Sequence, residues 1–457
     1  MLHTCLAFQA ARDMAPHIVI VGAGGAKRTH ARTPSRALAR TAPLPAPGSR
    51  SFPRGLMPCA STGVGCWVYA CIADAVRRDP ALARVTIVAR GAAYERLRDH
   101  GLKFLVRSAA PPVEGASTPA GDGDPARTVV LGPDAVRVVP TCATLQEQGV
   151  VADYVILCVK TWQVADAARQ AACLLRPGTG CLVTTQNGVA APIEATEATG
   201  SESAVMVGIA KVIAFREDDQ ARCIPDSGAL RCVRLGAPSP RTIMLGEYGA
   251  VRQSQSEQES QLPQKRTLGS DASEAGACVS CESERVSRLR NILRTSGIEV
   301  PEPEGGNIKR ELWRKATMMC CMGPMSAVTR ADIHTMLKTP ATRDMLRAAM
   351  EEVCALSARL PGCYVGDGWA DQTMTYLEPI KAGSTPSTVR DVVCGRPSEV
   401  REMSGAMHRL GLEYGVPMPV HSFIAAVMEP QEALARGERE YFLQGVPGGR
   451  PNCKSGK

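Results

Sequence analysis

A split glycine motif is the feature that most limits what this chain can fold into. The apolar run 18–21 is followed by Gly22-Ala23-Gly24, as a strand is followed by a phosphate-binding turn, but arginines and prolines come next. After Thr62 the sequence continues with Gly63-Val64-Gly65 and an apolar, helix-like run. Joined together, the two pieces read as strand, G-x-G-x-x-G and helix, with Gly25 or Gly63 following the second glycine.

Each glycine in this layout has a physical reason. The first allows a tight turn, and the second lets the backbone approach a pyrophosphate. The third lets the helix pack closely on the strand, so that its N-terminal N–H groups face the phosphates. A second strand at 84–90 completes a βαβ pattern. We therefore predict an α/β fold whose N-terminal part is a Rossmann-like dinucleotide-binding domain, with cofactor-binding positions at Gly22, Gly24, Gly63 and Gly65.

The residue that ends the second strand indicates which dinucleotide is bound. An NAD site favours Asp or Glu there, to hold the ribose 2′-hydroxyl, whereas an arginine suits the 2′-phosphate of NADP. The residue is Arg90, so we predict NADP(H) as the cofactor. The alternative interpretation is a solvated surface arginine, and the residue type alone leaves it open.

The segment 26–62 that splits the motif is rich in Pro, Arg, Ala and Ser and is predicted to be a disordered insert. It holds seven of the Lys and Arg residues and no Asp or Glu. The rest of the chain has 46 basic and 45 acidic residues, so we expect no nucleic-acid partner. The polar segment 250–284 is predicted to be a second insert. Whether the first insert abolishes cofactor binding stays open, because it interrupts the phosphate turn itself.

Strand and helix patterns alternate in the first two thirds of the chain, and from Asn307 the periodicity is helical. We predict four regions: an N-terminal extension (1–15), the Rossmann-like domain (16–304), an all-helical substrate and catalytic domain (305–440) and a flexible tail (441–457). The cysteines lack the spacing of a metal site, and no metal is expected.

No apolar run is long enough for a membrane span, and the N-terminus is a poor secretory signal. We therefore expect a cytoplasmic protein with no membrane partner, and mitochondrial targeting is the alternative. The sequence leaves the oligomeric state open, with a homodimer possible.

Four short stretches occur in a fixed order along the two predicted domains. They are VKTWQ (159–163), TQNGV (185–189), ELWRKA (311–316) and STVRDVVCGRPSEV (387–400). Together with the rejoined glycine motif, they resemble the ketopantoate reductase (2-dehydropantoate 2-reductase) family over about residues 17–430. The resemblance implies NADPH-dependent reduction of the 2-keto acid ketopantoate to pantoate, in pantothenate and coenzyme A biosynthesis.

The resemblance also implies roles for individual residues. Lys315 would protonate the oxygen that becomes the alcohol, and Glu399 would be the active-site carboxylate. Lys160 and Gln163 would contact the cofactor, and Asn187 would lie near both the nicotinamide and the substrate. Physical chemistry supports a lysine here, because an alkoxide forming in a closed site needs a nearby donor. Ser387 would be a substrate contact.

Each of these residues also has a structural alternative. Lys315 lies four residues after Glu311, the spacing of an ordinary helix ion pair. Asn187-Gly188 is a common turn pair. Glu399 follows Pro397-Ser398 and could simply favour a helix N-terminus.

The sequence departs from the family pattern at three positions. Best-known members carry asparagines one and two helical turns after the lysine, where this chain has Met319 and Gly323. Ser384, predicted as a substrate contact, replaces an asparagine expected shortly before Ser387. These departures leave open a related reductase of another branched 2-keto acid. The insert that splits the glycine motif leaves open a non-catalytic NADP-binding protein.

Overall fold

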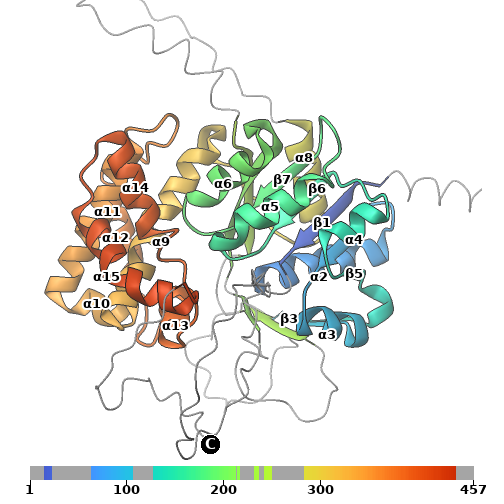
Figure 1. Cartoon of the computed structure of the whole chain (residues 1–457), viewed down its shortest axis with the longest axis horizontal. Helices are drawn as coiled ribbons and strands as arrows, with labels where there is room; N and C mark the ends of the chain where they lie inside the picture. The colour runs from blue at the N-terminus through green and yellow to red at the C-terminus, as the bar shows by residue number, and fades with distance from the viewer. Residues whose placement is uncertain are drawn as a thin grey trace, which may run out of the picture.

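The structure is a computed structural model. It describes seven segments of the chain, namely residues 15–22, 63–106, 127–212, 214–216, 231–235, 241–249 and 283–438 (Figure 1). The tail at 441–457, nearly all of the extension at 1–15 and the insert at 26–62 lie outside them. So does the segment predicted as the second insert, except at its end, where Ser283 already caps a helix that starts at Glu284.

A seven-stranded sheet, ordered β11-β8-β7-β6-β1-β2-β5, forms the N-terminal part. Every neighbouring pair is parallel except β11 with β8. The strand order reverses between β1 and β6, which is the doubly wound pattern of Rossmann-like folds. The α/β prediction is therefore confirmed. The strands are β1 (His17–Val21), β2 (Arg84–Val88), β5 (Val138–Val139), β6 (Tyr154–Leu157), β7 (Cys181–Thr184), β8 (Val205–Lys211) and β11 (Thr242–Glu247).

Helices cover both faces of this sheet, which is why its central strands are continuously apolar. Ile18 and Ile20 of β1 pack toward the side of α2 (Gly63–Arg78) and α8 (Glu284–Thr295). Val19 and Val21, which alternate with them, pack on the opposite side. That side is covered by α4 (Cys142–Glu147), α5 (Val164–Ala172) and α6 (Ala190–Thr199).

A second sheet, ordered β4-β3-β10-β9, lies beside the first. Its strands are β3 (Leu102–Val106), β4 (Arg127–Leu131), β9 (Ala214–Arg216) and β10 (Arg231–Leu235), and α3 (Ala92–His100) precedes them. β4 contains the apolar run 129–131. It pairs in this separate sheet and takes no place in the seven-stranded one.

The C-terminal part is helical throughout its described residues and lies to one side of the sheets (Figure 1). The side chain of Asn307 caps the first helix by accepting the Arg310 N–H at 3.0 Å. Residues 400–403 form turns, and the next helix begins at Ser404. The helices are α9 (Ile308–Thr329), α10 (Ile333–Lys338), α11 (Pro340–Ser357), α12 (Trp369–Leu377), α13 (Ser387–Val393), α14 (Ser404–Tyr414) and α15 (Pro419–Ala435).

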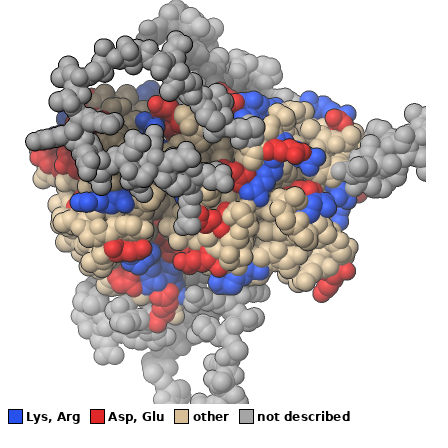
Figure 2. Space-filling model, turned by 90° about the horizontal axis from the view of Figure 1, so that it is seen from above, with Lys and Arg blue, Asp and Glu red and all other residues tan. Residues whose placement is uncertain are grey.

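One hydrophobic cluster contains residues from both the sheet part and the helical part. Val207 and Met244, from β8 and β11, belong to the same buried cluster as Leu312 and Trp313 of α9. α9 therefore forms both the centre of the helical part and its attachment to the sheet. Over the face shown in Figure 2, basic and acidic side chains are interspersed, with no continuous basic stripe.

Gly246→Ala should destabilise the protein, because a Cβ at this position would lie only 2.5 Å from Cβ of Ile308, where α9 meets β11. Overpacking of this kind costs about 1–3 kcal/mol. Gly132→Ala is the matched control, since nothing lies within 4 Å of a Cβ at that position. Urea unfolding followed by circular dichroism measures both variants. Equal free energies of unfolding would contradict this packing of α9.

Candidate active site

The two halves of the glycine motif meet at the end of β6. Gly22 has φ of 139°, and a Cβ on it would lie 2.5 Å from the carbonyl oxygen of Cys158. Gly65, in the first turn of α2, leaves only 2.9 Å between its would-be Cβ and Cβ of Cys158. Only residues without a side chain fit at these two positions. Gly63 is the first residue of α2, and Gly24 lies outside the described residues.

Three predicted site residues follow neighbouring parallel strands at their carboxyl ends. Gly22 follows β1, Lys160 lies shortly after β6, and Asn187 lies shortly after β7. Ligands of open α/β sheets bind at this edge, where the strand order reverses. Arg90 lies after β2, and its guanidinium donates to the side-chain carbonyl of Gln170. Because Gly22 and Gly65 have no side chains, β1 and α2 can pack closely and a dinucleotide can approach the backbone there.

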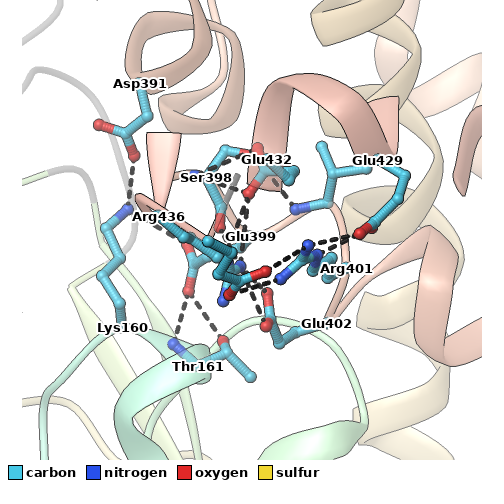
Figure 3. Close-up of polar contacts among 12 residues, drawn as sticks. Lys160, Thr161, Asp391, Ser398, Glu399, Arg401, Glu402, Glu429, Glu432 and Arg436 are labelled. Atoms are coloured by element: carbon cyan, nitrogen blue, oxygen red, sulfur yellow. Dashed lines mark hydrogen bonds and ion pairs between the residues drawn. The ribbon is translucent and has the colours of Figure 1, made fainter. Parts of the chain in front are cut away.

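A buried carboxylate joins the sheet part to the helical part (Figure 3). Oε1 of Glu399 accepts hydrogen bonds from the backbone N–H of Thr161 at 3.0 Å and from its hydroxyl at 2.8 Å. The ammonium of Lys160 lies 3.2 Å from Oε2 of Glu399 and 2.9 Å from Oδ2 of Asp391. Lys160 was predicted as a cofactor contact, and here it faces two carboxylates of the helical part. Gln163 accepts the backbone N–H of Lys160 at 3.3 Å and so stabilises this turn.

The charges in this cluster hold one another in the ionised state. Burial by itself would raise the pKa of Glu399, but the Lys160 ammonium and the two Thr161 hydrogen bonds outweigh it and lower that pKa. Burial would likewise lower the pKa of Lys160, but the carboxylates of Glu399 and Asp391 raise it above the usual lysine value. Lys160 is therefore a fixed cation at this site.

Lys315 lies on α9 and reaches the end of β8. Its ammonium donates to the carbonyl oxygen of Ala210 at 2.7 Å. Burial, together with the nearby charge of Lys211, lowers the pKa of Lys315 to about 8. Glu311 pairs instead with Arg314 at 2.8 Å. The alternative prediction, an ordinary ion pair between Lys315 and Glu311, is therefore wrong.

The loop after β7 lies against the helical part. The carbonyl of Asn187 accepts the Thr161 hydroxyl at 3.5 Å. Gly188 has φ of 85°, and a Cβ on it would lie 3.5 Å from Sγ of Cys320 on α9. Gln186 was missed by the sequence prediction. Its amide donates to the carbonyl of Leu157, the last residue of β6, at 2.8 Å and to that of Val159 at 3.0 Å, and thereby fixes the Asn187 loop.

The two predicted substrate serines lie at and before the start of α13. Ser387 is its first residue, and the backbone carbonyl of Ser384 accepts the Ile333 N–H at 3.1 Å. Neither serine hydroxyl has a hydrogen-bond partner among the described residues. Gly323 packs tightly here, because its would-be Cβ lies 2.9 Å from Oγ1 of Thr388. A side chain at Gly323 would require the Thr388 hydroxyl to shift.

The turn that carries Glu399 is held by a second buried network, which the sequence prediction missed (Figure 3). Glu432 of α15 accepts the Ser398 backbone N–H at 3.1 Å and its hydroxyl at 2.5 Å. Arg436 lies 3.1 Å from Glu402 and 3.3 Å from Glu432. Thr161 and Asp391 were also missed, although both lie inside quoted stretches.

Two ranges of the chain match models of known protein families. Residues 61–230 match "Ketopantoate reductase PanE/ApbA", and residues 307–432 match "Ketopantoate reductase PanE/ApbA C terminal". The chain belongs to the ketopantoate reductase PanE/ApbA family. This is a family of oxidoreductases that bind a dinucleotide and use NAD(P)H.

Similar sequences are named 2-dehydropantoate 2-reductase. One, from Mesorhizobium japonicum, is 26% identical over 82% of this chain and 96% of its own length. Another, from Aquifex aeolicus, is 25% identical over 32% of this chain and 47% of its own length. The chain thus spans nearly all of one relative and about half of the other.

Three solved structures share the ketopantoate reductase fold. The 2-dehydropantoate 2-reductase from Geobacter metallireducens is 18% identical, with a TM-score of 0.58 over 91% of this chain and 99% of that one. D-mandelate dehydrogenase with NADH and anilino(oxo)acetate is 14% identical, with a TM-score of 0.59 over 92% and 99%. The dimeric ketopantoate reductase from Staphylococcus aureus is 14% identical, with a TM-score of 0.53 over 91% and 98%.

Other kinds of site are not apparent in the described part of the chain. No helix there is long and apolar enough to cross a membrane. In the same residues, no group of three His, Cys, Asp or Glu side chains is placed to hold a metal. Grooves of about 570 and 590 Å³ lie elsewhere on the helical part, and neither is lined by Lys160, Lys315 or Glu399.

Glu399→Gln should destabilise the protein by ~3 kcal/mol at pH 7, because it leaves part of the buried Lys160 charge unpaired. The folded-state pKa of Glu399 lies below its unfolded value. Its ionised form therefore stabilises the fold above the unfolded pKa, and this contribution is lost as pH falls through the folded value. The difference in free energy of unfolding between variant and wild type should therefore become smaller as the pH falls. Denaturant unfolding from pH 7 to pH 3 measures it.

Glu378→Gln, which removes an exposed partner of Arg343, is the control and should change stability by less than ~1 kcal/mol at any pH. A Glu399→Gln variant as stable as the wild type at pH 7 would show that the contacts of Glu399 with Lys160 and Thr161 contribute nothing to stability.

Proposed function

We propose that this protein is an NADPH-dependent reductase of 2-keto acids, with ketopantoate as the leading substrate and pantoate as the product. The observation that carries the proposal is the position of Lys315. Its ammonium lies at the carboxyl end of β8, beside the sheet edge that fits a dinucleotide, and its pKa of about 8 suits proton donation near neutral pH. The product would enter pantothenate and coenzyme A biosynthesis.

The chain's own residues would have distinct roles in the reaction. A reduced nicotinamide, when bound, supplies the hydride that the ketone carbon receives. Lys315 then gives a proton to the ketone oxygen and recovers one from solvent, so that the net reaction consumes one hydride and one proton. An ammonium has three donors, and the bond to Ala210 uses only one of them. Glu399 keeps Lys160 and Thr161 in place below the Asn187 loop.

The cofactor would lie along the edge formed by Gly22 and Gly65. Gly24 and Gly63 complete the phosphate turn in this proposal, and Arg90 would bind the 2′-phosphate that distinguishes NADP from NAD. Lys160, Gln163 and Asn187 would line the nicotinamide end.

A second candidate is a related reductase of another branched 2-keto acid, and one observation favours it. Past Lys315, the same face of α9 carries Met319, and Gly323 has no side chain and packs against Thr388. The fold neighbour D-mandelate dehydrogenase is named with a ligand other than ketopantoate. In either case Ser387 and Ser384 would contact the substrate. We expect a cytoplasmic enzyme, and the name of the S. aureus neighbour supports a homodimer.

Lys315→Ala should lower kcat for NADPH-dependent ketopantoate reduction by at least ~100-fold, as expected for loss of a general acid. In the wild type, kcat should fall as pH rises through about 8, because the donating ammonium loses its proton there. Steady-state assays from pH 6 to pH 10 measure both effects. Lys338→Ala, at an exposed lysine on α10, is the control. Activity that survives Lys315→Ala would refute the catalytic assignment.

NADPH should bind more tightly than NADH, and Arg90→Ala should weaken NADPH binding by about 10-fold while leaving NADH unchanged. Fluorescence titration of the full-length chain gives both dissociation constants. The same titration on a chain lacking residues 26–62 tests whether the insert impairs the phosphate turn. Binding of NADPH by both forms without turnover of any 2-keto acid would favour the non-catalytic alternative.

A further inference from the structure

The proposed function gives the ketone oxygen a proton donor and the substrate two serine contacts, but it assigns no cation to the carboxylate of a 2-keto acid. In such an acid the carboxylate carbon is bonded directly to the ketone carbon. A group that binds the carboxylate must therefore lie within a few Å of the group that binds the ketone oxygen. A buried or half-buried carboxylate also needs a cation or several hydrogen-bond donors.

The lysines around the site differ in their availability. Lys160 is held between Glu399 and Asp391. Lys309, near the start of α9, lies over the ring of Tyr248 at 4.6 Å. Lys211, the last residue of β8, is exposed, and within the described residues its ammonium forms no ion pair or hydrogen bond. Lys211 is thus a cation with free donors.

Backbone geometry places Lys211 next to Lys315. The carbonyl that receives the Lys315 ammonium at 2.7 Å belongs to Ala210, whose carbonyl carbon is bonded to the nitrogen of Lys211. The Lys315 ammonium therefore lies within about 5 Å of the Lys211 backbone nitrogen. The flexible stem of Lys211 can bring a second ammonium to a group that Lys315 already holds. The lowered pKa of Lys315, to which Lys211 contributes, is consistent with this proximity.

The part of α9 that follows Lys315 has no charged side chain up to Gly323. α9 carries Met319 one turn after Lys315 on the same face, and at Gly323, two turns on, no side chain is present. Cys320 is fully buried, and its Sγ lies against Gly188 in the Asn187 loop. Met319, which is half-buried, therefore offers an apolar contact and no strong hydrogen-bond donor beside Lys315.

We propose that Lys211 binds the α-carboxylate of the 2-keto acid while Lys315 holds its ketone oxygen. This inference rests on the proposed function and deepens it, because it names the group that recognises the α-carboxylate of the 2-keto acid. Lys211 is then a specificity-determining residue, and it discriminates a carboxylate from an uncharged group at the same position.

The test compares an acid with its own uncharged analogue. Ketopantoate and its primary amide are assayed with NADPH on the full-length wild type and on Lys211→Met, Lys211→Gln and Lys211→Arg. Calorimetry also measures binding of ketopantoate to each protein with NADP⁺ present, which requires no turnover. Lys338→Met is the matched control.

Loss of a charge-assisted hydrogen bond should raise the KM and the dissociation constant for the acid by about 10–100-fold in the Met and Gln variants. The KM values for the amide and for NADPH should stay unchanged, and kcat should stay within about 3-fold of the wild-type value. The Lys211→Arg variant should recover most of the affinity for the acid. The ratio of the KM for the acid to the KM for the amide is compared between the wild type and the two neutral variants. Equal ratios would overturn the role of Lys211, even where wild-type turnover supports the proposed function.

The two hypotheses can fail separately. A wild type that binds ketopantoate in a Lys211-dependent way without reducing it would support the carboxylate site and refute the reductase assignment. A wild type that neither binds nor reduces the acid would overturn both.

Discussion

The structure depends on one buried carboxylate that crosses between its two parts. Glu399 comes from a turn of the helical part, yet its partners, Thr161 and Lys160, belong to the turn after β6. A buried charge is tolerated only when it is paired and hydrogen-bonded. The contact therefore fixes the helical part in one position relative to the sheet edge where a dinucleotide fits. Asp391 strengthens the same contact by sharing the Lys160 ammonium, and Arg436 and Glu432 hold the Glu399 turn from behind.

α9 adds a second, apolar connection, and the two together place Lys315. Leu312 and Trp313 bury one face of the helix against β8 and β11, and this aims the next turn at the end of β8. Lys315 then has a backbone carbonyl as its hydrogen-bond partner and Lys211 as a cationic neighbour. An amine in such surroundings is more easily deprotonated than one in water. The helix thus supplies both the location of the ammonium and its chemical character.

The family pattern is retained where the chemistry is shared and changed where the substrate side chain would lie. The lysine, the carboxylate and the Asn187 loop are present and lie around one junction. The asparagine positions after the lysine are Met319 and Gly323, and the second is filled from outside by Thr388 of α13. The space beside Gly323 is thus occupied by a side chain of the neighbouring helix.

The sequence by itself determined the fold class and the order of its elements, because both follow from local periodicity. Apolar runs bounded by glycines gave the parallel strands, and the change to a 3.6-residue period gave the helical part. It also indicated that Gly22 and Gly65 belong together across the 42 residues between them, since each lies in one half of the same motif. Only the tertiary structure decided which partner each charged group takes. Periodicity favoured Glu311 for Lys315, but the helix turns that ammonium toward Ala210, and Glu311 pairs with Arg314. Lys160 and Glu399 are 239 positions apart, and no local pattern encodes their contact. A charge finds its partner through the packing of whole elements, which is a property of the folded chain and not of any short stretch of it.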